Sequence, residues 1–377
     1  MKQLQKYLVL ALVAVPLVGF TGGAMTNSVI KPNEAVASPA LKKGSSAKLY
    51  GRLWSQYSNT KKAGGEANTT IFDDEGMARM GFKGKSSIGN GYSVNYKVEW
   101  AIDLGDGDSS GLDGEDVAKD SGKTVEGNKG HAFTNKQSWL GLLTPYGQFK
   151  FGSMESPYKF LAKHDILHDT LAQMRDTRGI SQGSMSHSGY WRTAGFYELK
   201  AGNFRFAAIR GFSNHDEAAY SSNNKKDYGY GLEYKNLGIK GLSLVYAMNH
   251  DHSADKENKK YTITYDMKLA DKRKVKVWYM HEDVEIDSKM FDSSEGEVDW
   301  YGIHYSSGPM KLQYSIANTE SDAGSATEGD GTAYNVGMQY KLSKTSRFYA
   351  GYSDHDGDAG NNSTDFRTYI FGLRHDF

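Results

Sequence analysis

The sequence contains no cysteine, which excludes disulfide bonds and thiolate chemistry. Proline is also scarce, with 6 residues in 377. Beyond the amino terminus, no stretch approaches the roughly 20 consecutive apolar residues that a membrane-spanning helix needs. If the chain resides in a membrane, it must therefore cross as β-strands, because a barrel strand needs only about 9–11 residues and can be polar on one face.

Glycine (43) and tyrosine (25) are abundant, as is typical of many strands joined by tight turns with aromatic side chains at both membrane interfaces. The 45 basic and 45 acidic residues cancel, so the chain has no overall field that would attract nucleic acid, and no nucleic-acid partner is expected. A length of 377 residues suffices for two soluble domains or for one large barrel.

The clearest strand pattern stands at the carboxyl end of the chain. Tyr369, Phe371, Leu373 and Phe377 share one face of a strand, whereas the residues between them are mostly polar or small. Alternation with a period of two predicts one apolar face and one wet face. A strand of this kind that ends in an aromatic residue suits the closing strand of an outer-membrane β-barrel.

Similar patterns predict sixteen strands, at about 47–58, 73–86, 90–104, 131–143, 146–154, 189–201, 203–213, 227–236, 239–251, 260–270, 272–284, 297–306, 309–319, 331–342, 345–354 and 365–377. Several have polar faces too rich in lysine and glutamate to pack as a soluble core, so these faces should line water. The connections alternate between short and long, as in barrels with short periplasmic turns and long external loops. We therefore predict an all-β, sixteen-stranded antiparallel transmembrane barrel with both chain ends on the periplasmic side.

The amino terminus has the composition of a secretory signal peptide. Lys2 and Lys6 precede an apolar run, 7–20, that is too short to span a membrane well. Small residues allow cleavage after Ala24 or after Ala37, and the sequence leaves both open. The predicted divisions are a signal peptide over 1–24, extending at most to 37, a periplasmic lead-in over 38–46, and the barrel over 47–377.

In order and spacing, several motifs resemble those of the general porins of Gram-negative outer membranes. The matching segments include Leu49-Tyr50-Gly51-Arg52, Ala78-Arg79-Met80-Gly81-Phe82, Phe133-Thr134-Asn135-Lys136-Gln137, Tyr146-Gly147-Gln148-Phe149 and Gly372-Leu373-Arg374-His375-Asp376-Phe377. The resemblance implies a trimeric barrel in the outer membrane through which small hydrophilic solutes and ions diffuse passively, without enzymatic activity or cofactor. It also implies lipopolysaccharide as a neighbour, and recognition of the strand ending at Phe377 by the barrel-assembly machinery.

The resemblance further implies a ladder of basic side chains on the barrel wall, carried here by Arg52, Arg79 and Lys136. Strand periodicity independently places Arg52 and Arg79 on the polar face, and it pairs Lys136 with Ser138 against Trp139. Further candidates for the pore lining are Lys97, Glu99 and Lys150.

The third long connection, 155–188, would fold into the pore and face this ladder. It departs from the family because the usual Pro-Glu-Phe-Gly segment is absent. Its acidic side would come from Asp165, Asp169 and Asp176, offset by Arg175 and Arg178. Opposed charges across a narrow aqueous gap orient dipolar solutes. Since the loop differs, the family's ion preference does not carry over.

Two groups of residues have partial metal-binding patterns. His164 and His168 are four residues apart, but no third ligand is evident, and a solvated loop helix is the favoured alternative. A calcium-loop-like spacing is formed by Asp354, Asp356, Asp358, Asn362 and Asp365. Ala359 stands where such a loop needs glycine, so a hydrated acidic loop is favoured and no metal site is predicted.

Three other functions remain open beside passive diffusion. A substrate-selective channel, for instance for anions, would show saturable conductance. An adhesion or structural barrel would be closed to ions. An outer-membrane hydrolase would need catalytic pairs such as His215-Asp216 or His250-Asp251, although no nucleophile elbow or phosphate-binding glycine loop is present.

Overall fold

The computed structural model describes residues 45–62, 64–72, 78–102, 133–174, 190–212, 226–252, 255–285, 296–321, 331–357 and 366–377. These residues form a single antiparallel sheet of seventeen strands and one short helix, α2 (Pro157–Phe160). Within them, no helix has the length and apolar character needed to cross a membrane. The predicted signal peptide and periplasmic lead-in lie outside the described residues and stay predictions.

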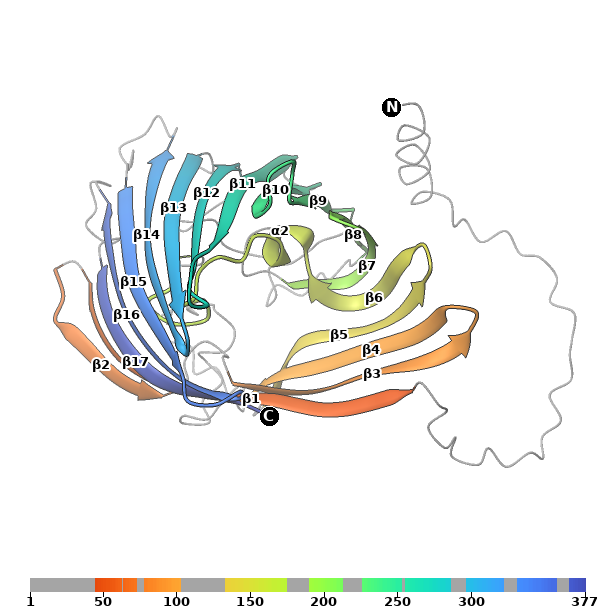
Figure 1. The fold of residues 1–377 in the computed structure, drawn as a ribbon, viewed down its shortest axis with the longest axis horizontal. Coiled ribbons are helices and arrows are strands. Elements are labelled where there is room, and N and C mark those ends of the chain that lie inside the picture. Colours follow the sequence, from red (N-terminus) through yellow and green to blue (C-terminus); the bar gives the residue numbers. More distant parts are fainter. Residues whose placement is uncertain are drawn as a thin grey trace, which may run out of the picture. The chain divides into compact units, whose positions relative to one another are not determined.

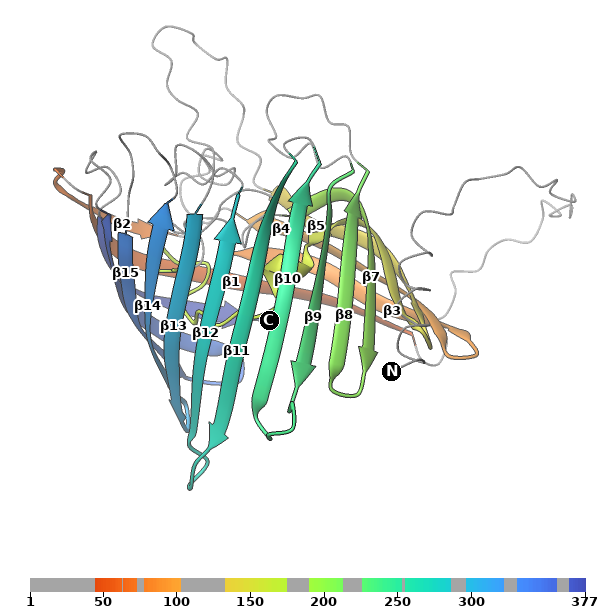
Figure 2. The same cartoon turned by 90° about the horizontal axis from the view of Figure 1, so that it is seen from above.

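The strands are β1 (Ser46–Lys62), β2 (Ala67–Phe72), β3 (Arg79–Gly89), β4 (Tyr92–Ile102), β5 (Phe133–Thr144), β6 (Gly147–Glu155), β7 (Tyr190–Ala201), β8 (Phe204–Gly211), β9 (Tyr228–Lys235), β10 (Leu242–Asp251), β11 (Lys256–Lys268), β12 (Lys274–Val284), β13 (Gly296–Ser307), β14 (Met310–Ser321), β15 (Gly331–Lys341), β16 (Ser346–Gly357) and β17 (Phe366–Asp376). From β3 to β17, each strand pairs with its neighbours in the sequence, and Figure 2 shows β7 to β15 side by side in this order.

Pairing of β1 with β17 closes the sheet into a barrel (Figure 1). On its other side, β1 pairs with β3 over its first half and with β2 over its second half, so β2 and β3 occupy one position in the ring. The barrel therefore has sixteen strand positions, as predicted. The sequence did not predict β2, because its Asn-Thr-Thr segment lacks apolar alternation; a turn at Gly64, with φ of +65°, folds it back onto β1.

The two faces of the strands differ as the alternation predicts. On β17, Phe371 is 58% exposed on the outer face, whereas its neighbour Ile370 on the inner face is 3% exposed. Inward-facing polar residues such as Asn335 and Ser353 are buried inside the barrel. The hydrophilic average of the sequence thus results from a polar interior enclosed by an apolar outer wall.

Phe377 extends the seam between the first and last strands. Its N–H donates to the Gly51 carbonyl at 3.0 Å, and its carbonyl accepts from the Gly51 N–H at 3.1 Å. The aromatic ring lies over Gly51, where a Cβ atom would stand 2.6 Å from Phe377 Cε1. Glycine at this position therefore leaves the space into which the terminal ring packs.

Replacing Gly51 with alanine should therefore destabilise the closed barrel by about 1–3 kcal/mol, as overpacking commonly does. The measurement is the folded fraction across a urea series, read from heat-modifiable gel migration. In a Phe377→Ala background the same substitution should have little further effect, since the ring is gone. Equal losses in both backgrounds would show that the ring is not the cause.

Candidate functional site

The chain leaves β6 at Glu155 and turns inward, so that α2 lies inside the ring of strands (Figure 1). Tyr158 of α2 is fully buried, and its hydroxyl donates to Glu282 Oε1 on β12 at 3.0 Å. Lys260 on β11 is 0% exposed and donates to the carbonyl oxygens of Tyr158 and Leu161. A buried ammonium group satisfied in this way ties the start of the loop to the barrel wall.

Asp165 organises the middle of this loop. Its Oδ1 accepts from the Leu167 N–H at 2.8 Å and from Gln313 Nε2 at 2.9 Å, and its Oδ2 accepts from the Met174 N–H at 2.7 Å. The side chain amide oxygen of Gln313 also accepts from the Ile166 N–H at 2.8 Å. The structure thus places Asp165, 4% exposed, in hydrogen bonds with two N–H groups of the loop and with Gln313 of β14, rather than at the expected pore surface.

Leu167 fixes the loop against the opposite wall. It is fully buried between two strands whose glycines make room for it. A Cβ atom on Gly337 of β15 would lie 2.9 Å from Leu167 Cγ, and one on Gly351 of β16 would lie 2.5 Å from Leu167 Cδ1. The surrounding apolar cluster consists of Trp54, Ile166, Ala172, Tyr349 and Ile370.

Asp169 is the residue of this loop that forms ion pairs with the predicted basic ladder. Arg52 and Arg79 are direct register partners on β1 and β3, an arrangement of like charges that is unfavourable by itself. Asp169 Oδ2 lies 3.0 Å from Arg79 Nη2 and 3.4 Å from Arg52 Nη1. One loop carboxylate therefore bridges both arginines, and these three sequence candidates do converge.

A second carboxylate on the wall joins the cluster from the closing strand. Asp376 is the register partner of Arg52, and its Oδ1 lies 3.1 Å from Arg52 Nε. Arg347 and Arg374 each place Nη2 2.9 Å from the same carboxylate. The sequence candidates did not include these three residues, although the alternation in the last strand places Arg374 and Asp376 on its wet face.

Glu99 connects the ladder to β4. Its Oε2 accepts from the Tyr50 hydroxyl at 2.9 Å and lies 3.1 Å from Lys97 Nζ, while its Oε1 lies 3.8 Å from Arg79 Nη1. Lys97 and Glu99, expected only as pore lining, therefore belong to the same charged group as Arg79.

A β-bulge in β5 places Lys136 near the charged group around Arg79. The register between β4 and β5 shifts by one residue there, which leaves Lys136 without a partner on β4. The shift reverses the alternation beyond it: Trp139 faces inward, with Lys150 Nζ 4.9 Å from its ring centre, so the predicted pairing of Lys136 with Ser138 against Trp139 is wrong. Lys136 lies close enough to Arg79, Asp169, Glu99 and Arg52 to be affected by their charges.

Lys150 lines a cavity of about 350 Å³ that Lys97 also lines. Its ammonium group stands over the rings of Trp139 and Phe196, at 4.9 and 4.4 Å. Glu155 and Arg205 line the same cavity. Asp176, the remaining acidic candidate, lies outside the described residues.

The two loop histidines have separate partners. His164 stacks on Trp278 with ring centres 4.9 Å apart, and burial, followed by the charge of Lys276, holds its pKa well below the usual range. His168 Nδ1 instead lies 2.9 Å from the Asp165 carbonyl oxygen. In the described part of the chain, neither belongs to a group of three potential metal ligands.

The calcium-like segment is described only in part. Asp354 lies 3.1 Å from Arg367 Nε and accepts hydrogen bonds from Tyr334 and Tyr352 at 3.0 and 2.6 Å. Asp356 is exposed, and the other three candidates, Asp358, Asn362 and Asp365, lie outside the described residues.

A family model described as Gram-negative porin matches residues 11–377 of the chain. No curated protein sequence matches it. Among solved structures, the anion-selective porin from Comamonas acidovorans is similar at 16% identity and a TM-score of 0.63, covering 88% of this chain and 100% of that one. OmpT of Vibrio cholerae, at 15% identity and a TM-score of 0.61, covers 89% and 98%, and Salmonella typhi OmpF in complex with daunomycin, at 14% and 0.60, covers 88% and 97%. At these identities the structural likeness concerns the fold alone.

Proposed function

Because the chain belongs to the Gram-negative porin family and is thus an outer-membrane channel for passive diffusion of small hydrophilic solutes, we propose that its constriction makes the channel prefer anions. The observation that carries this proposal is the excess of positive charge around Asp169. The described residues of the cluster comprise six basic side chains and three carboxylates, which leaves three positive charges in excess. They are Arg52, Arg79, Arg347, Arg374, Lys97 and Lys136, with Asp169, Asp376 and Glu99.

A second group of cations supports the same preference. Lys276, Lys311 and Lys341 each lie within three residues of a short turn, on the inward-facing side of their strands. Lys311 is close enough to the other two to be affected by their charges, and the carboxylate of Asp266 lies 3.6 Å from Lys276. Fixed charges of one sign along an aqueous path raise the local concentration of the opposite ion.

Four further features belong to this proposal. The chain forms a homotrimer, as a similar structure described as a trimer form of OmpT from Vibrio cholerae does. Phe377 serves as the assembly signal read by the barrel-assembly machinery. The outer wall contacts lipopolysaccharide and other outer-membrane lipid. The channel performs no catalysis.

Single-channel recording of the refolded protein in a planar bilayer tests the proposal. We expect large, non-saturating conductance in steps of three, and a reversal potential of the anion-selective sign under a salt gradient. Saturation at millimolar solute would favour a substrate-selective channel. Silence from a folded barrel would favour an adhesion or structural role.

Replacing Arg79 with alanine should lower the anion-to-cation permeability ratio about fivefold. A unit charge at 4 Å in water changes the free energies of an anion and a cation by about 1 kcal/mol each, with opposite signs, which would change their ratio about 30-fold. Screening by salt reduces this to about fivefold. The measurement is the reversal potential under a tenfold salt gradient. Arg273→Ala, which removes the same charge at an exposed turn, is the matched control and should leave the potential unchanged. An unshifted potential for the Arg79 variant would refute the assignment of Arg79 to the constriction.

A further inference from the structure

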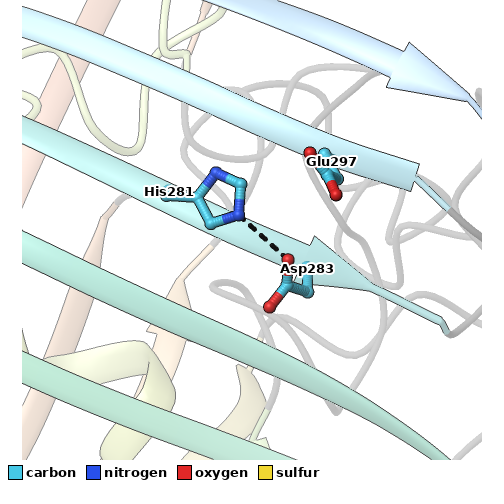
Figure 3. Close-up of side chains that lie close together, drawn as sticks. All are labelled: His281, Asp283 and Glu297. Carbon is cyan, nitrogen blue, oxygen red and sulfur yellow. Dashed lines mark hydrogen bonds and ion pairs between the residues drawn. The ribbon is translucent and has the colours of Figure 1, made fainter.

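The outer face of β12 and β13 carries a cluster of side chains that the channel function does not use. His281, Asp283, Glu297 and Asp299 alternate with buried inward-facing residues and share the outer face with Tyr301, which is 45% exposed. Across the two strands, His281 is the register partner of Asp299, and Asp283 is the register partner of Glu297. Figure 3 shows the side chains of three of them, His281, Asp283 and Glu297, close together on the two neighbouring strands.

Three side chains of this cluster carry potential ligand atoms that lie close to one another. The ligand atoms of His281, Asp283 and Glu297 all lie within 4.8 Å of one another, and His281 Nε2 is 3.0 Å from Asp283 Oδ1 (Figure 3). Two ligands of one zinc ion, each at about 2.0–2.1 Å from it, stand roughly 3 Å apart. The two closest atoms are therefore already at the separation that a shared ion requires.

A residue outside this ligand set orients the imidazole. Asp299 Oδ1 lies 3.0 Å from His281 Nδ1, and the Tyr279 hydroxyl donates to the same oxygen at 2.6 Å. Metal-binding histidines commonly donate one ring N–H to a carboxylate in this way, which fixes the ring and directs the other nitrogen toward the metal. Asp299 is thus a positioning residue that leaves Nε2 facing Asp283.

Negative charge is in excess where Asp283 and Glu297 face each other across the strands. Asp283 and Glu297 are directly opposite one another, and Glu320 on β14 is directly opposite Glu297. Lys259, the partner of Asp283 on β11, forms an ion pair with Glu257. Within the described residues, neither Glu297 nor Glu320 has a basic partner. Adjacent like charges across strands are destabilising, and a divalent cation would offset them.

We propose that His281, Asp283 and Glu297 bind a divalent transition-metal ion of the zinc class on the outer wall of the barrel. One imidazole nitrogen and two carboxylates suit zinc and its neighbours, whereas calcium and magnesium prefer oxygen ligands throughout. On binding, the ion takes the place of a proton on Nε2, which passes to solvent, while Nδ1–H keeps its bond to Asp299. Asp283 and Glu297 are each one residue from a strand end, at the rim of the barrel, where water can occupy the remaining coordination positions.

Zinc titration calorimetry tests the proposal on the full chain, folded in detergent and freed of metal with a chelator. We expect His281→Ala to lose one zinc site, or to weaken it at least tenfold, and Glu297→Gln to do the same. Asp299→Asn should weaken the site about 10- to 100-fold, as loss of an orienting carboxylate does. His375→Ala is the matched control, because this histidine is also exposed on the outer face, with its Nδ1 2.8 Å from Ser346 Oγ.

Other histidines of the chain can contribute heat, so the comparison between variants decides the question. Identical zinc binding by wild type and His281→Ala would overturn the proposal, as would the absence of zinc binding by the wild type. Calcium binding that is as tight as zinc binding and survives His281→Ala would also overturn it, since the carboxylates alone would then hold the ion. Heat-modifiable gel migration verifies that each variant is folded. If His281→Ala does not fold, Glu297→Gln still tests the site, because Glu297 is exposed and its substitution should not disturb folding.

Discussion

Replacing Asp169 with asparagine is expected to raise the anion-to-cation permeability ratio of the channel about fivefold to tenfold. The carboxylate bridges Arg52 and Arg79, at 3.4 and 3.0 Å, so its loss uncovers two guanidinium groups. A unit charge changes the free energy of an ion at 4 Å in water by about 1 kcal/mol, with opposite signs for anions and cations, and salt reduces the effect. Reversal potentials under a salt gradient measure it.

Asparagine is a suitable replacement because Asp169 has φ of +66°, a conformation that asparagine tolerates well. The loop backbone should therefore keep its course. Asp271→Asn makes the same change at a residue with φ of +56° in an exposed turn, and it should leave the selectivity as it is. A shift of the Asp169 variant toward cations, or no shift, would contradict the geometry described above.

Replacing Asp165 with alanine should release the loop that follows β6 from the barrel wall. Three donors, the N–H groups of Leu167 and Met174 and the amide of Gln313, would lose their acceptor. Each unsatisfied donor costs about 1–3 kcal/mol, so the loop would be destabilised by about 3 kcal/mol or more. We expect larger and noisier single-channel currents, and more than 100-fold faster trypsin cleavage after Lys159 or Lys163, since each 1.4 kcal/mol changes the released population about tenfold.

Two further variants serve as comparisons for Asp165→Ala. Asp165→Asn keeps one oxygen acceptor and should be intermediate. Asp266→Ala removes a carboxylate that pairs with Lys276 on the barrel wall, and it should not change the rate of loop cleavage. Wild-type cleavage and conductance in Asp165→Ala would show that these hydrogen bonds do not hold the loop in place.

The sequence by itself determined most of the strands and their two faces. A strand has a side-chain period of two, so alternation over a few residues reports which side faces lipid and which faces water. Tyr369, Phe371 and Leu373 lie outward for this reason, and the same parity assigned Arg52 and Arg79 to the polar face. These are local properties, and local residue order is sufficient to encode them.

The predicted faces of β5 were wrong because a β-bulge interrupts the strict alternation of side chains along the strand. The bulge at Lys136 inserts one residue relative to β4, and every later side chain changes face. Trp139 therefore points inward, although the alternation read from the sequence placed it outward. No residue type in that segment predicts the extra residue, because a bulge is defined only by the register with the neighbouring strand.

Tertiary structure alone decided how the charges are used. Asp165 and Asp169 are equivalent in the sequence, yet one satisfies loop N–H groups and the other bridges two arginines. The cluster around Asp376 joins residues from β1, β16 and β17, the two ends of the chain. Such contacts depend on closure of the barrel and on the inward course of one loop, which bring together groups hundreds of residues apart, and no periodicity along the chain records distances of that kind.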